Sequence, residues 1–291
     1  MTAPDASPSV VIVTYNSSAV IGECLSSLAR FEGESTQVVV VDNASTDGTA
    51  ELVEQAHPWV RLLRQPANRG FSAGVNAGVA ATDSDYVLLL NPDSWLVSPI
   101  ISDLAAAISS DPKIGALGPK ILNEDGTLQP SCRRYPTVWS SLFNRTSLLT
   151  KLLPWNPVTR HYLMTDFDHA SARDVDWLSC AALLLRRTAF DEIGGMDESY
   201  FLYFEDVDLC HRIHDASYRV VYHPAVSVVH LISKSSGGVS NRTILARHRA
   251  MWRYWRSYQG GNVAKDLVAG AAIAGRAGFY LAANSLSRPK P

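Results

Sequence analysis

The sequence predicts an α/β fold with a mostly parallel central sheet and helices on both of its faces. Three observations support this prediction: short β-branched apolar runs occur early in the chain, segments with helical spacing separate them, and polar residues follow them directly. Parallel strands need a crossover, which is usually a helix, so the alternation implies parallel pairing. Ligands gather at the carboxyl ends of such strands, so these polar residues are the first candidates for a site.

The first half of the chain shows the alternation most clearly. Apolar runs of strand length cover residues 10–13, 37–41, 60–63 and 86–90. Segments with helical spacing are expected over residues 19–29, 46–56, 74–81 and 100–109. Tyr15, Asp42 and Asp93 follow strands and therefore fall at one edge of the sheet.

The second half departs from this regular order. Residues 120–122 and 127–129 flank an Asn-Glu-Asp-Gly turn and predict a hairpin. Residues 134–175 show no clear period, and we expect a long, partly helical excursion of the kind that often covers a site. The elements expected after it are a strand over 177–185, a helix from about 188, a helix over 204–215 and a strand over 226–229.

A C-terminal helical extension over residues 241–291 is expected beyond a catalytic domain over residues 8–240. Within it, residues 244–258 place apolar side chains on one helical face, with arginines largely opposite at Arg242, Arg249, Arg253 and Arg256. This pattern is typical of a helix at a membrane surface, and it also fits a helix that packs on the domain with a solvated basic face. Residues 263–283 carry three charges, which argues against a bare transmembrane span.

The composition excludes several classes of protein. A formal net charge of -2 over 291 residues argues against nucleic-acid binding, which usually needs a broad excess of Lys and Arg. The four cysteines are far apart in the sequence, which argues against a zinc or disulfide framework and favours a reducing compartment. The first residues lack a cationic start followed by an apolar run, so we expect a cytoplasmic active part.

Three carboxylates stand between apolar residues at Glu205, Asp206 and Asp208. Burial and mutual repulsion would raise at least one of their pKa values toward neutrality, which is how a general base is made. On a helix, Glu205 and Asp208 would share a face with Arg212, while Asp206 points elsewhere, toward solvent or substrate. The alternative is an acidic first turn that suits the helix dipole, with Asp208 paired to Arg212 in the scaffold.

Two residues are candidate ligands for a divalent cation that neutralises a diphosphate. Asp93 follows a buried strand, although an ordinary Asn-Pro-Asp turn is the simpler interpretation. His230 ends the 226–229 run and gains weight only as a partner for Asp93. In the loop that follows, Ser235 and Ser236 are candidates to approach phosphate oxygens.

The segment of residues 68–78 has glycines at every fourth position, which lets a helix pack closely on a sheet or a ligand. It is not the Gly-x-Gly-x-x-Gly dinucleotide fingerprint, because it does not follow the first strand. A nicotinamide-dependent dehydrogenase is therefore disfavoured. A nucleotidyltransferase is also disfavoured, since residues 16–22 contain no Lys or Arg for a basic phosphate loop.

Taken together and in order, these segments resemble the bacterial family-2 glycosyltransferases with the GT-A fold, a Rossmann-like nucleotide-diphospho-sugar transferase fold, over residues 8–240. The matching phrases are VVIVTYNS, VVVVDNASTDGT, NRGFSAGVNAG, LLLNPDS, WLSCAALLLRR, GGMDESYFLYFEDVDLCHR and VVHLISKSSG. Their number and order make the match specific. The sequence is most similar to the rhamnosyltransferase branch that acts on polyprenyl-diphosphate-linked sugars.

The resemblance implies a nucleotide site in which Tyr15 stacks on the base and Asp42 bonds its ring imide. It assigns supporting positions in this site to Thr14, Asn16, Asn43, Asn68, Gly74 and Asn91. Asp93 takes the last position of an Asp-x-Asp metal motif and His230 a further ligand position, with Mg²⁺ or Mn²⁺ as the cofactor. Asn91 stands where the motif has its first Asp, which removes one carboxylate.

For the acceptor, the resemblance implies that Asp206 is the catalytic base and that Glu205 places the acceptor or tunes the base. Trp177 and Cys180 fall on the acceptor side, and Cys180 stands where the family often has Gly. The implied reaction is a single displacement with inversion at the anomeric carbon.

The implied donor is dTDP-L-rhamnose and the implied acceptor a polyprenyl-diphosphate-linked GlcNAc, in cell-wall or surface-polysaccharide assembly. UDP-galactofuranose, UDP-glucose and UDP-GlcNAc stay open as donors, as does a non-catalytic nucleotide-sugar-binding module. We expect the protein to be cytoplasmic and peripheral on the inner face of the cell membrane.

Overall fold

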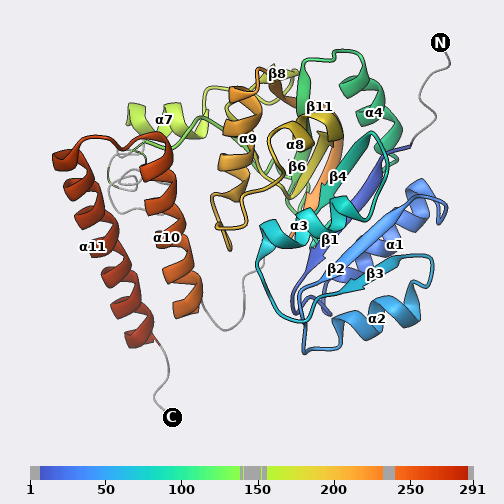
Figure 1. The fold of residues 1–291 in the computed structure, drawn as a ribbon. Coiled ribbons are helices and arrows are strands. Elements are labelled where there is room, and N and C mark those ends of the chain that lie inside the picture. Colours follow the sequence, from blue (N-terminus) through green and yellow to red (C-terminus); the bar gives the residue numbers. More distant parts are fainter. Residues whose placement is uncertain (1–6, 138–139, 141–151, 153–155, 232–239, 288–291) are drawn as a thin grey trace.

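The computed structural model describes residues 7–137, 140, 152, 156–231 and 240–287 (Figure 1). The strands are β1 (Ser9–Thr14), β2 (Val38–Asp42), β3 (Arg61–Arg64), β4 (Tyr86–Leu90), β5 (Ser94–Leu96), β6 (Ile114–Leu122), β7 (Cys132–Arg133), β8 (Arg173–Asp174), β9 (Trp177–Leu178), β10 (Ala182–Arg186) and β11 (Arg219–His230). The helices are α1 (Ile21–Glu32), α2 (Thr49–Ala56), α3 (Phe71–Ala80), α4 (Ile101–Ser109), α7 (Pro157–Leu163), α8 (Arg187–Glu192), α9 (Glu205–Asp215), α10 (Asn241–Tyr258) and α11 (Val263–Ser287).

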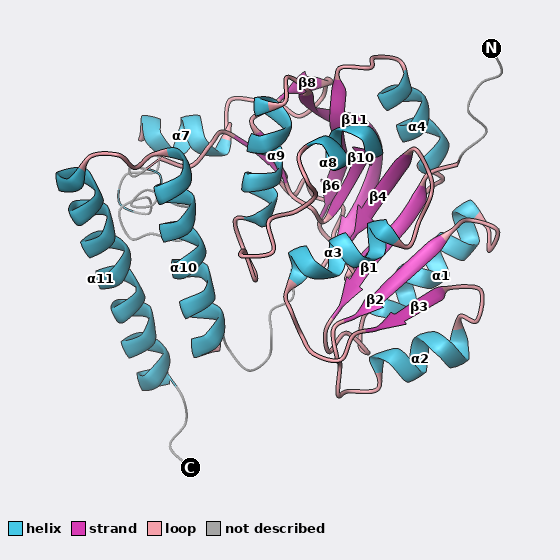
Figure 2. Ribbon diagram, in the orientation of Figure 1, coloured by secondary structure: helices cyan, strands magenta, loops and turns pink. Residues whose placement is uncertain are grey.

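Most of the strands join one mixed sheet in the order β3-β2-β1-β4-β10-β6-β11-β5, with β8 beside β11 (Figure 2). The first four are parallel, as the alternation predicts. β10 then runs antiparallel between β4 and β6, and β11 is parallel to β6. The predicted mostly parallel α/β sheet is confirmed.

Helices cover both faces of this sheet because its strands alternate between two apolar cores. In β1, Val10 and Ile12 pack with α1, α2 and α4 on one face, whereas Val11 and Val13 pack with α3 and α9 on the other. All four side chains are buried. Each such burial stabilises the fold by about 1.5–3 kcal/mol, so a strand with no polar face is held firmly in register.

The expected strand over residues 177–185 was wrong as a single element. Trp177 and Leu178 pair with β7 in a separate two-stranded sheet, while Ala182–Arg186 joins the main sheet. Between them, the Ser179 N–H donates to the Ser131 carbonyl and the Ala181 carbonyl accepts from Ser94 and Asn91. The run changes partners midway, and hydrophobicity alone does not mark that change.

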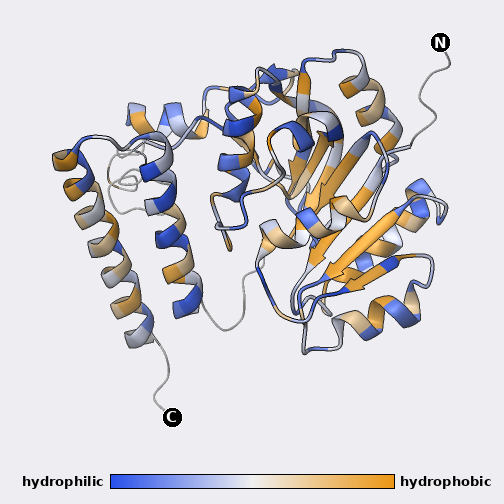
Figure 3. Cartoon of the chain, in the orientation of Figure 1, coloured by the Kyte–Doolittle hydropathy of each residue, from blue (hydrophilic) through white to orange (hydrophobic). Residues whose placement is uncertain are grey.

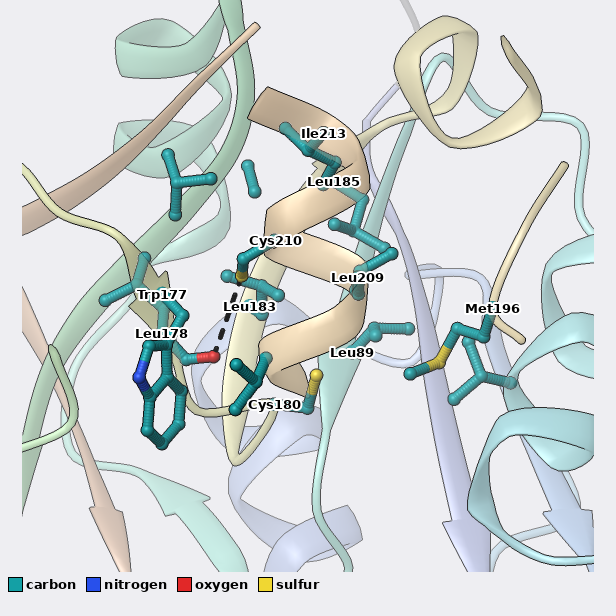
Figure 4. Close-up of a cluster of buried hydrophobic side chains, with 14 of the residues drawn as sticks. Leu89, Trp177, Leu178, Cys180, Leu183, Leu185, Met196, Leu209, Cys210 and Ile213 are labelled. Carbon is teal, nitrogen blue, oxygen red and sulfur yellow. Dashed lines mark hydrogen bonds between the residues drawn. The ribbon is translucent and has the colours of Figure 1, made fainter. Parts of the chain in front are cut away.

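This change of sheet places Trp177 and Leu178 against α9 in a buried apolar cluster (Figure 4). The Cys210 thiol points at the Leu178 carbonyl, at 4.0 Å. Cys180 lies in the same cluster. All four cysteines are buried and unpaired with one another, in agreement with the absence of a disulfide framework.

The predicted hairpin after residue 120 is confirmed, although it is short. Asn123 N–H donates to the Thr127 carbonyl at 2.8 Å, and Gln129 N–H donates to the Ile121 carbonyl at 2.9 Å. The long excursion contains α7 and β8 and is therefore partly helical, as expected. Much of its middle lies outside the described residues.

The C-terminal pair of helices stands beside the sheet, with α10 facing the catalytic core and α11 outside it (Figure 1). The apolar face of α10 is turned inward: Ile244, Met251 and Trp255 are buried. Arg253 pairs with Asp197, and Arg256 pairs with Asp266 of α11. Packing on the domain thus describes α10, and the domain boundary at residue 240 stays a prediction.

Close approach of α3 to the sheet depends on its glycines. A Cβ at Gly78 would lie 2.4 Å from Val11 Cγ1, and Val11 is a stiff β-branched residue buried in β1. We expect Gly78→Ala to lower the free energy of unfolding by about 1–3 kcal/mol through overpacking. Urea denaturation would measure it.

Gly22→Ala is the matched control, because Gly22 also lies in a helix and a Cβ there meets nothing within 4 Å. We expect this variant to be neutral or to gain up to about 1 kcal/mol. Equal stability of the two variants would show that the fit of α3 on β1 does not depend on Gly78.

Candidate active site

The carboxyl ends of β1 and β2 hold a buried carboxylate beside an exposed aromatic ring. Thr14 Oγ1 donates to Asp42 Oδ1 at 2.9 Å, and the Ser45 N–H donates to Asp42 Oδ2 at 2.9 Å. Asp42 is therefore fixed in orientation. Tyr15, the next residue after β1, has 52% of its surface exposed, so its ring is available for stacking.

The loops after β1 and β2 are tied together through Asn16. Its backbone is left-handed, with φ of 52°. Its N–H donates to Ser45 Oγ at 2.8 Å, and its side-chain oxygen accepts from the Thr46 N–H at 2.9 Å. Asn16 thus fixes the rim around Asp42, and its side-chain oxygen is occupied within the protein.

Asn43 connects this rim to the start of α3. Its Nδ2 donates to the Gly70 carbonyl at 3.0 Å, while its Oδ1 is buried without a hydrogen-bond partner in the described part of the chain. Asn68 Oδ1 accepts from the Gly70 N–H at 2.9 Å. A Cβ on Gly74 would lie 2.5 Å from Val13, so the close packing of helix on sheet is confirmed there.

Gly70 also joins this half of the site to the chain that leads into α9. Its φ is +93°, and a Cβ would lie 2.5 Å from the Phe201 carbonyl oxygen. The next residue, Phe71, donates its N–H to that carbonyl at 3.1 Å, and Ser72 Oγ donates to the Tyr200 carbonyl at 2.9 Å. The backbone at Gly70 and Phe71 is therefore in direct contact with the backbone of Phe201, and this contact is called the Gly70 seam.

The predicted metal ligands lie together at the ends of β4, β5 and β11. His230 Nε2 is 3.3 Å from Asp93 Oδ1 and 3.5 Å from Asn91 Nδ2. Gln129 Oε1 accepts from His230 Nδ1 at 2.7 Å, so the ring is held with Nε2 toward Asp93.

This arrangement fits Mg²⁺ or Mn²⁺. A carboxylate oxygen, an imidazole nitrogen oriented by a second partner, and a nearby amide suit such a cation, whose other positions are filled by phosphate and water oxygens. Within the described residues there is no group of three or more His, Cys, Asp or Glu side chains that could hold a metal. Ser235 and Ser236 lie outside the described residues.

Glu205 and Asp206 open α9, directly after two residues with left-handed backbone, Tyr203 and Phe204. Both keep some exposed surface, yet protein surrounds both carboxyl groups. Burial raises the pKa of both, and the neighbouring Asp206 charge raises that of Glu205 further. Glu205 Oε2 is buried without a hydrogen-bond partner in the described residues.

Asp208 belongs to the scaffold. Its Oδ2 accepts from Arg212 Nε at 2.8 Å, and its Oδ1 accepts from the Tyr258 hydroxyl at 2.7 Å. The expected pairing of Asp208 with Arg212 is confirmed, whereas Glu205 forms no ion pair with Arg212. Asp208 is therefore a structural carboxylate, whereas Glu205 and Asp206 take no part in its hydrogen-bond network.

Trp177 and Cys180 lie on the same side as this pair. Burial raises the pKa of the Cys180 thiol well above its usual value, and the Asp206 and Glu205 charges add to this effect. The Trp177 Nε1–H donates to the Arg134 carbonyl at 2.9 Å, which fixes the indole. The Cys180 thiol therefore stays neutral and forms an apolar surface beside the two carboxyl groups.

Sequence reasoning missed Arg133. It lies opposite Trp177 in the small sheet, and its guanidinium sits over the indole ring, 5.3 Å from the centroid. Its charge reaches Asp206 and lowers the pKa that burial raises there. The only signal in the sequence is a pair of arginines after a cysteine, at the start of the 134–175 stretch that has no clear period.

Solved structures that share this fold include a mannosyltransferase and GalNAc-T7. The chain matches a mannosyltransferase from Pyrobaculum calidifontis in complex with GDP-Man and Mn²⁺ with a TM-score of 0.59 and 19% identity, over 100% of this chain and 79% of that chain. It matches GalNAc-T7 with UDP, GalNAc and Mn²⁺ with a TM-score of 0.61 and 18% identity, over 87% of this chain and 49% of that chain. At these identities the likeness shows the fold, which is of the GT-A type.

Residues 9–174 match the model of glycosyl transferase family 2, and the chain belongs to this family. It is therefore a glycosyltransferase. It is 37% identical over 254 residues to an N-acetylglucosaminyl-diphospho-decaprenol L-rhamnosyltransferase of Mycobacterium tuberculosis, covering 84% of this chain and 82% of that protein. It is 28% identical over 226 residues to a low-salt glycan biosynthesis hexosyltransferase of Haloferax volcanii, covering 76% and 66%.

The metal site can be tested without turnover. We expect His230→Ala to weaken Mn²⁺ binding in the presence of nucleoside diphosphate by about tenfold or more, because it removes a ligand position. Titration of free Mn²⁺ by electron paramagnetic resonance would measure it. The control is His57→Ala, which changes the residue directly after α2 and should bind Mn²⁺ as the unmodified protein does. Unchanged affinity in His230→Ala would remove this residue from the site.

Proposed function

We propose that the chain transfers L-rhamnose from dTDP-L-rhamnose to a polyprenyl-diphosphate-linked GlcNAc, with inversion at the anomeric carbon. The observation that carries the proposal is the buried Glu205 and Asp206 pair, which stands outside the scaffold network of Asp208. The substrate choice rests on the 37% identity to the mycobacterial rhamnosyltransferase over most of both chains.

The donor nucleotide is placed at the rim of β1 and β2. Tyr15 stacks on the base, and Asp42, held by Thr14, faces its ring imide. The remaining nucleotide-site positions are Asn16, Asn43, Asn68, Gly74 and Asn91. The unbonded Asn43 Oδ1 supports this placement, because a buried amide oxygen gains a partner when a ligand donor arrives.

Asp93 and His230 hold the divalent cation in this proposal. When bound, the cation neutralises charge on the departing nucleoside diphosphate. Asn91 stands in place of a first carboxylate, so the protein would supply little negative charge to a bound cation.

Asp206 acts as the base. The acceptor oxygen forms a bond to the anomeric carbon, the bond from that carbon to the diphosphate breaks, and the acceptor proton passes to Asp206. Glu205 suits this role less, because burial and the Asp206 charge both hold its proton on. In its protonated form Glu205 donates a hydrogen bond to the acceptor, and Trp177 and Cys180 provide the acceptor wall.

The reaction can be tested by release of nucleoside diphosphate from a panel of donors. The panel comprises dTDP-L-rhamnose, UDP-galactofuranose, UDP-glucose and UDP-GlcNAc, each with Mg²⁺ or Mn²⁺ and with polyprenyl-diphosphate-GlcNAc present or absent. We expect acceptor-dependent release from dTDP-L-rhamnose alone, and its loss on chelation of the cation. Release from another donor would overturn the substrate, and silence across the panel would favour a non-catalytic nucleotide-sugar-binding module.

Asp206→Asn keeps the size of the side chain and removes the base. We expect transfer to fall by about a hundred- to ten-thousand-fold, with the affinity for dTDP little changed. Asp215→Asn, at the exposed end of the same helix, is the control and should keep full activity. Substantial transfer by Asp206→Asn would remove Asp206 from the base position.

The pH dependence of transfer should follow the same group. A base works only when ionised, and burial raises the pKa of Asp206, although the Val207 N–H and the Arg133 charge oppose this. The rate should therefore fall as the pH decreases through a value well above the about 3.9 of an ordinary aspartate. A kcat profile that stays flat down to the ordinary range would contradict this assignment.

We place the protein in the cytoplasm, at the inner face of the cell membrane, through α11. No described helix is long and apolar enough to cross a membrane. Apolar residues nonetheless recur along α11 (Figure 3). Three of them are exposed on its outer face: Val263 over 77%, Leu267 over 70% and Phe279 over 70% of their surface. An apolar helix face beside the active domain suits contact with a bilayer that holds a lipid-linked acceptor.

Replacing Leu267 and Phe279 by Gln should release the protein from vesicles. Each substitution removes an apolar side chain that would be buried in the bilayer. We therefore expect binding to vesicles of phosphatidylglycerol and phosphatidylcholine to weaken by about tenfold or more in a sedimentation assay. Val97→Gln, which alters an exposed apolar residue elsewhere on the molecule, is the control. Equal sedimentation of all three proteins would exclude α11 as the membrane contact.

A further inference from the structure

Arg133 lies in the small sheet that packs on α9, and its charge acts on Asp206. Among the described residues it forms no ion pair, and its buried Nε has no hydrogen-bond partner. The adjacent Arg134 shows the contrast, because it pairs with Asp176 at 2.9 Å. Arg134 therefore serves the scaffold, whereas the guanidinium of Arg133 is directed to the Trp177 indole.

The position of Arg133 is nonetheless well defined. Arg133 faces Trp177 across the small sheet, and its guanidinium carbon lies 5.3 Å from the centroid of the indole ring. The Tyr162 hydroxyl takes one hydrogen bond from the guanidinium, and the planar fork of its remaining donors matches phosphate oxygens. This is the geometry of an anion-binding residue.

The elements around Arg133 connect the start of α9 with α7 and α11. The strand that pairs with β7, β9, packs on α9, and α9 begins with Glu205 and Asp206. After β7, the Arg134 N–H donates to the Tyr162 carbonyl of α7 at 3.1 Å, and the charges of Arg133 and of Arg276 in α11 both act on the Tyr162 hydroxyl. Phe204, directly before α9, lines a hollow together with Ala272 and Ile273 of α11, whose outer face is apolar.

This order matches the chemistry of a lipid-linked sugar. Such an acceptor presents a sugar hydroxyl at one end, a diphosphate next, and a hydrocarbon tail beyond. We propose that Arg133 binds the diphosphate of the acceptor and so holds the sugar hydroxyl against Asp206, while the tail leaves toward α11. This inference rests on the proposed function, since it names the acceptor group that the same site recognises.

The first test is equilibrium binding of a short-chain polyprenyl-diphosphate-GlcNAc to the full chain in the presence of dTDP. We expect Arg133→Gln to weaken this binding by about tenfold or more, because it removes a charge-assisted pair of hydrogen bonds, and Arg133→Lys to recover part of the loss. Arg160→Gln in α7 removes an exposed arginine that pairs with Asp166 and is the matched charge control. Thermal unfolding of each variant verifies that it is folded.

The second test compares two acceptors in the transfer assay. At a pH where Asp206 is fully ionised in both proteins, we expect Arg133→Gln to raise KM for the diphosphate acceptor by about tenfold and to raise KM for octyl GlcNAc, which has no phosphate, several-fold less. An equal fall of kcat with both acceptors, together with a shifted pH profile, would overturn the proposal and make Arg133 a positioning residue for Asp206.

Two other outcomes would also overturn it. Loss of dTDP-sugar affinity in Arg133→Gln would place the arginine at the donor diphosphate, and unchanged acceptor binding would remove it from both. Failure of the proposed function is distinguishable, because the unmodified chain would then transfer from no donor, whereas the binding comparison would still report on Arg133.

Discussion

The buried carboxylate of Asp208 is the interaction on which the rest of the active site depends. It joins α9 to α10 through Tyr258, and Arg212 carries the same network on to the carbonyls of Ile193 and Gly195. A buried charge is costly unless it is paired and fully hydrogen-bonded, so these partners hold the helix in one place. The start of α9 is thereby fixed by residues that take no part in the chemistry.

Two carboxyl groups of α9, those of Asp208 and Glu205, differ in how many hydrogen-bond partners the protein gives them. Asp208 has a protein partner on both oxygens, whereas Glu205, one turn earlier, has a buried oxygen without a partner in the described residues. A carboxyl group surrounded by protein with incomplete bonding holds its proton more tightly. In the proposed reaction, the acceptor hydroxyl completes what the protein leaves open.

The sequence was sufficient to predict the first half of the fold, because fully apolar strands are easily recognised in it. It also predicted that Asp93 lies close to His230, because the ends of such strands meet at one edge of the sheet. It was insufficient where contacts change along one apolar run, as between Leu178 and Ala182. Arg133 was missed because its importance depends on Trp177, which lies 44 positions away, beyond the 134–175 stretch that has no clear period. The roles of the individual site residues stay predictions.

The seam at Gly70 has a consequence for how far this enzyme can vary. Because Gly70 meets the Phe201 carbonyl without a side chain between them, the span from the nucleotide rim to the start of α9 is set by main-chain atoms. Main-chain spacing does not change with rotamer or with the size of neighbouring residues. In the proposed enzyme, the side chains that line the sugar pocket can therefore differ without changing the distance from the nucleotide site to the start of α9.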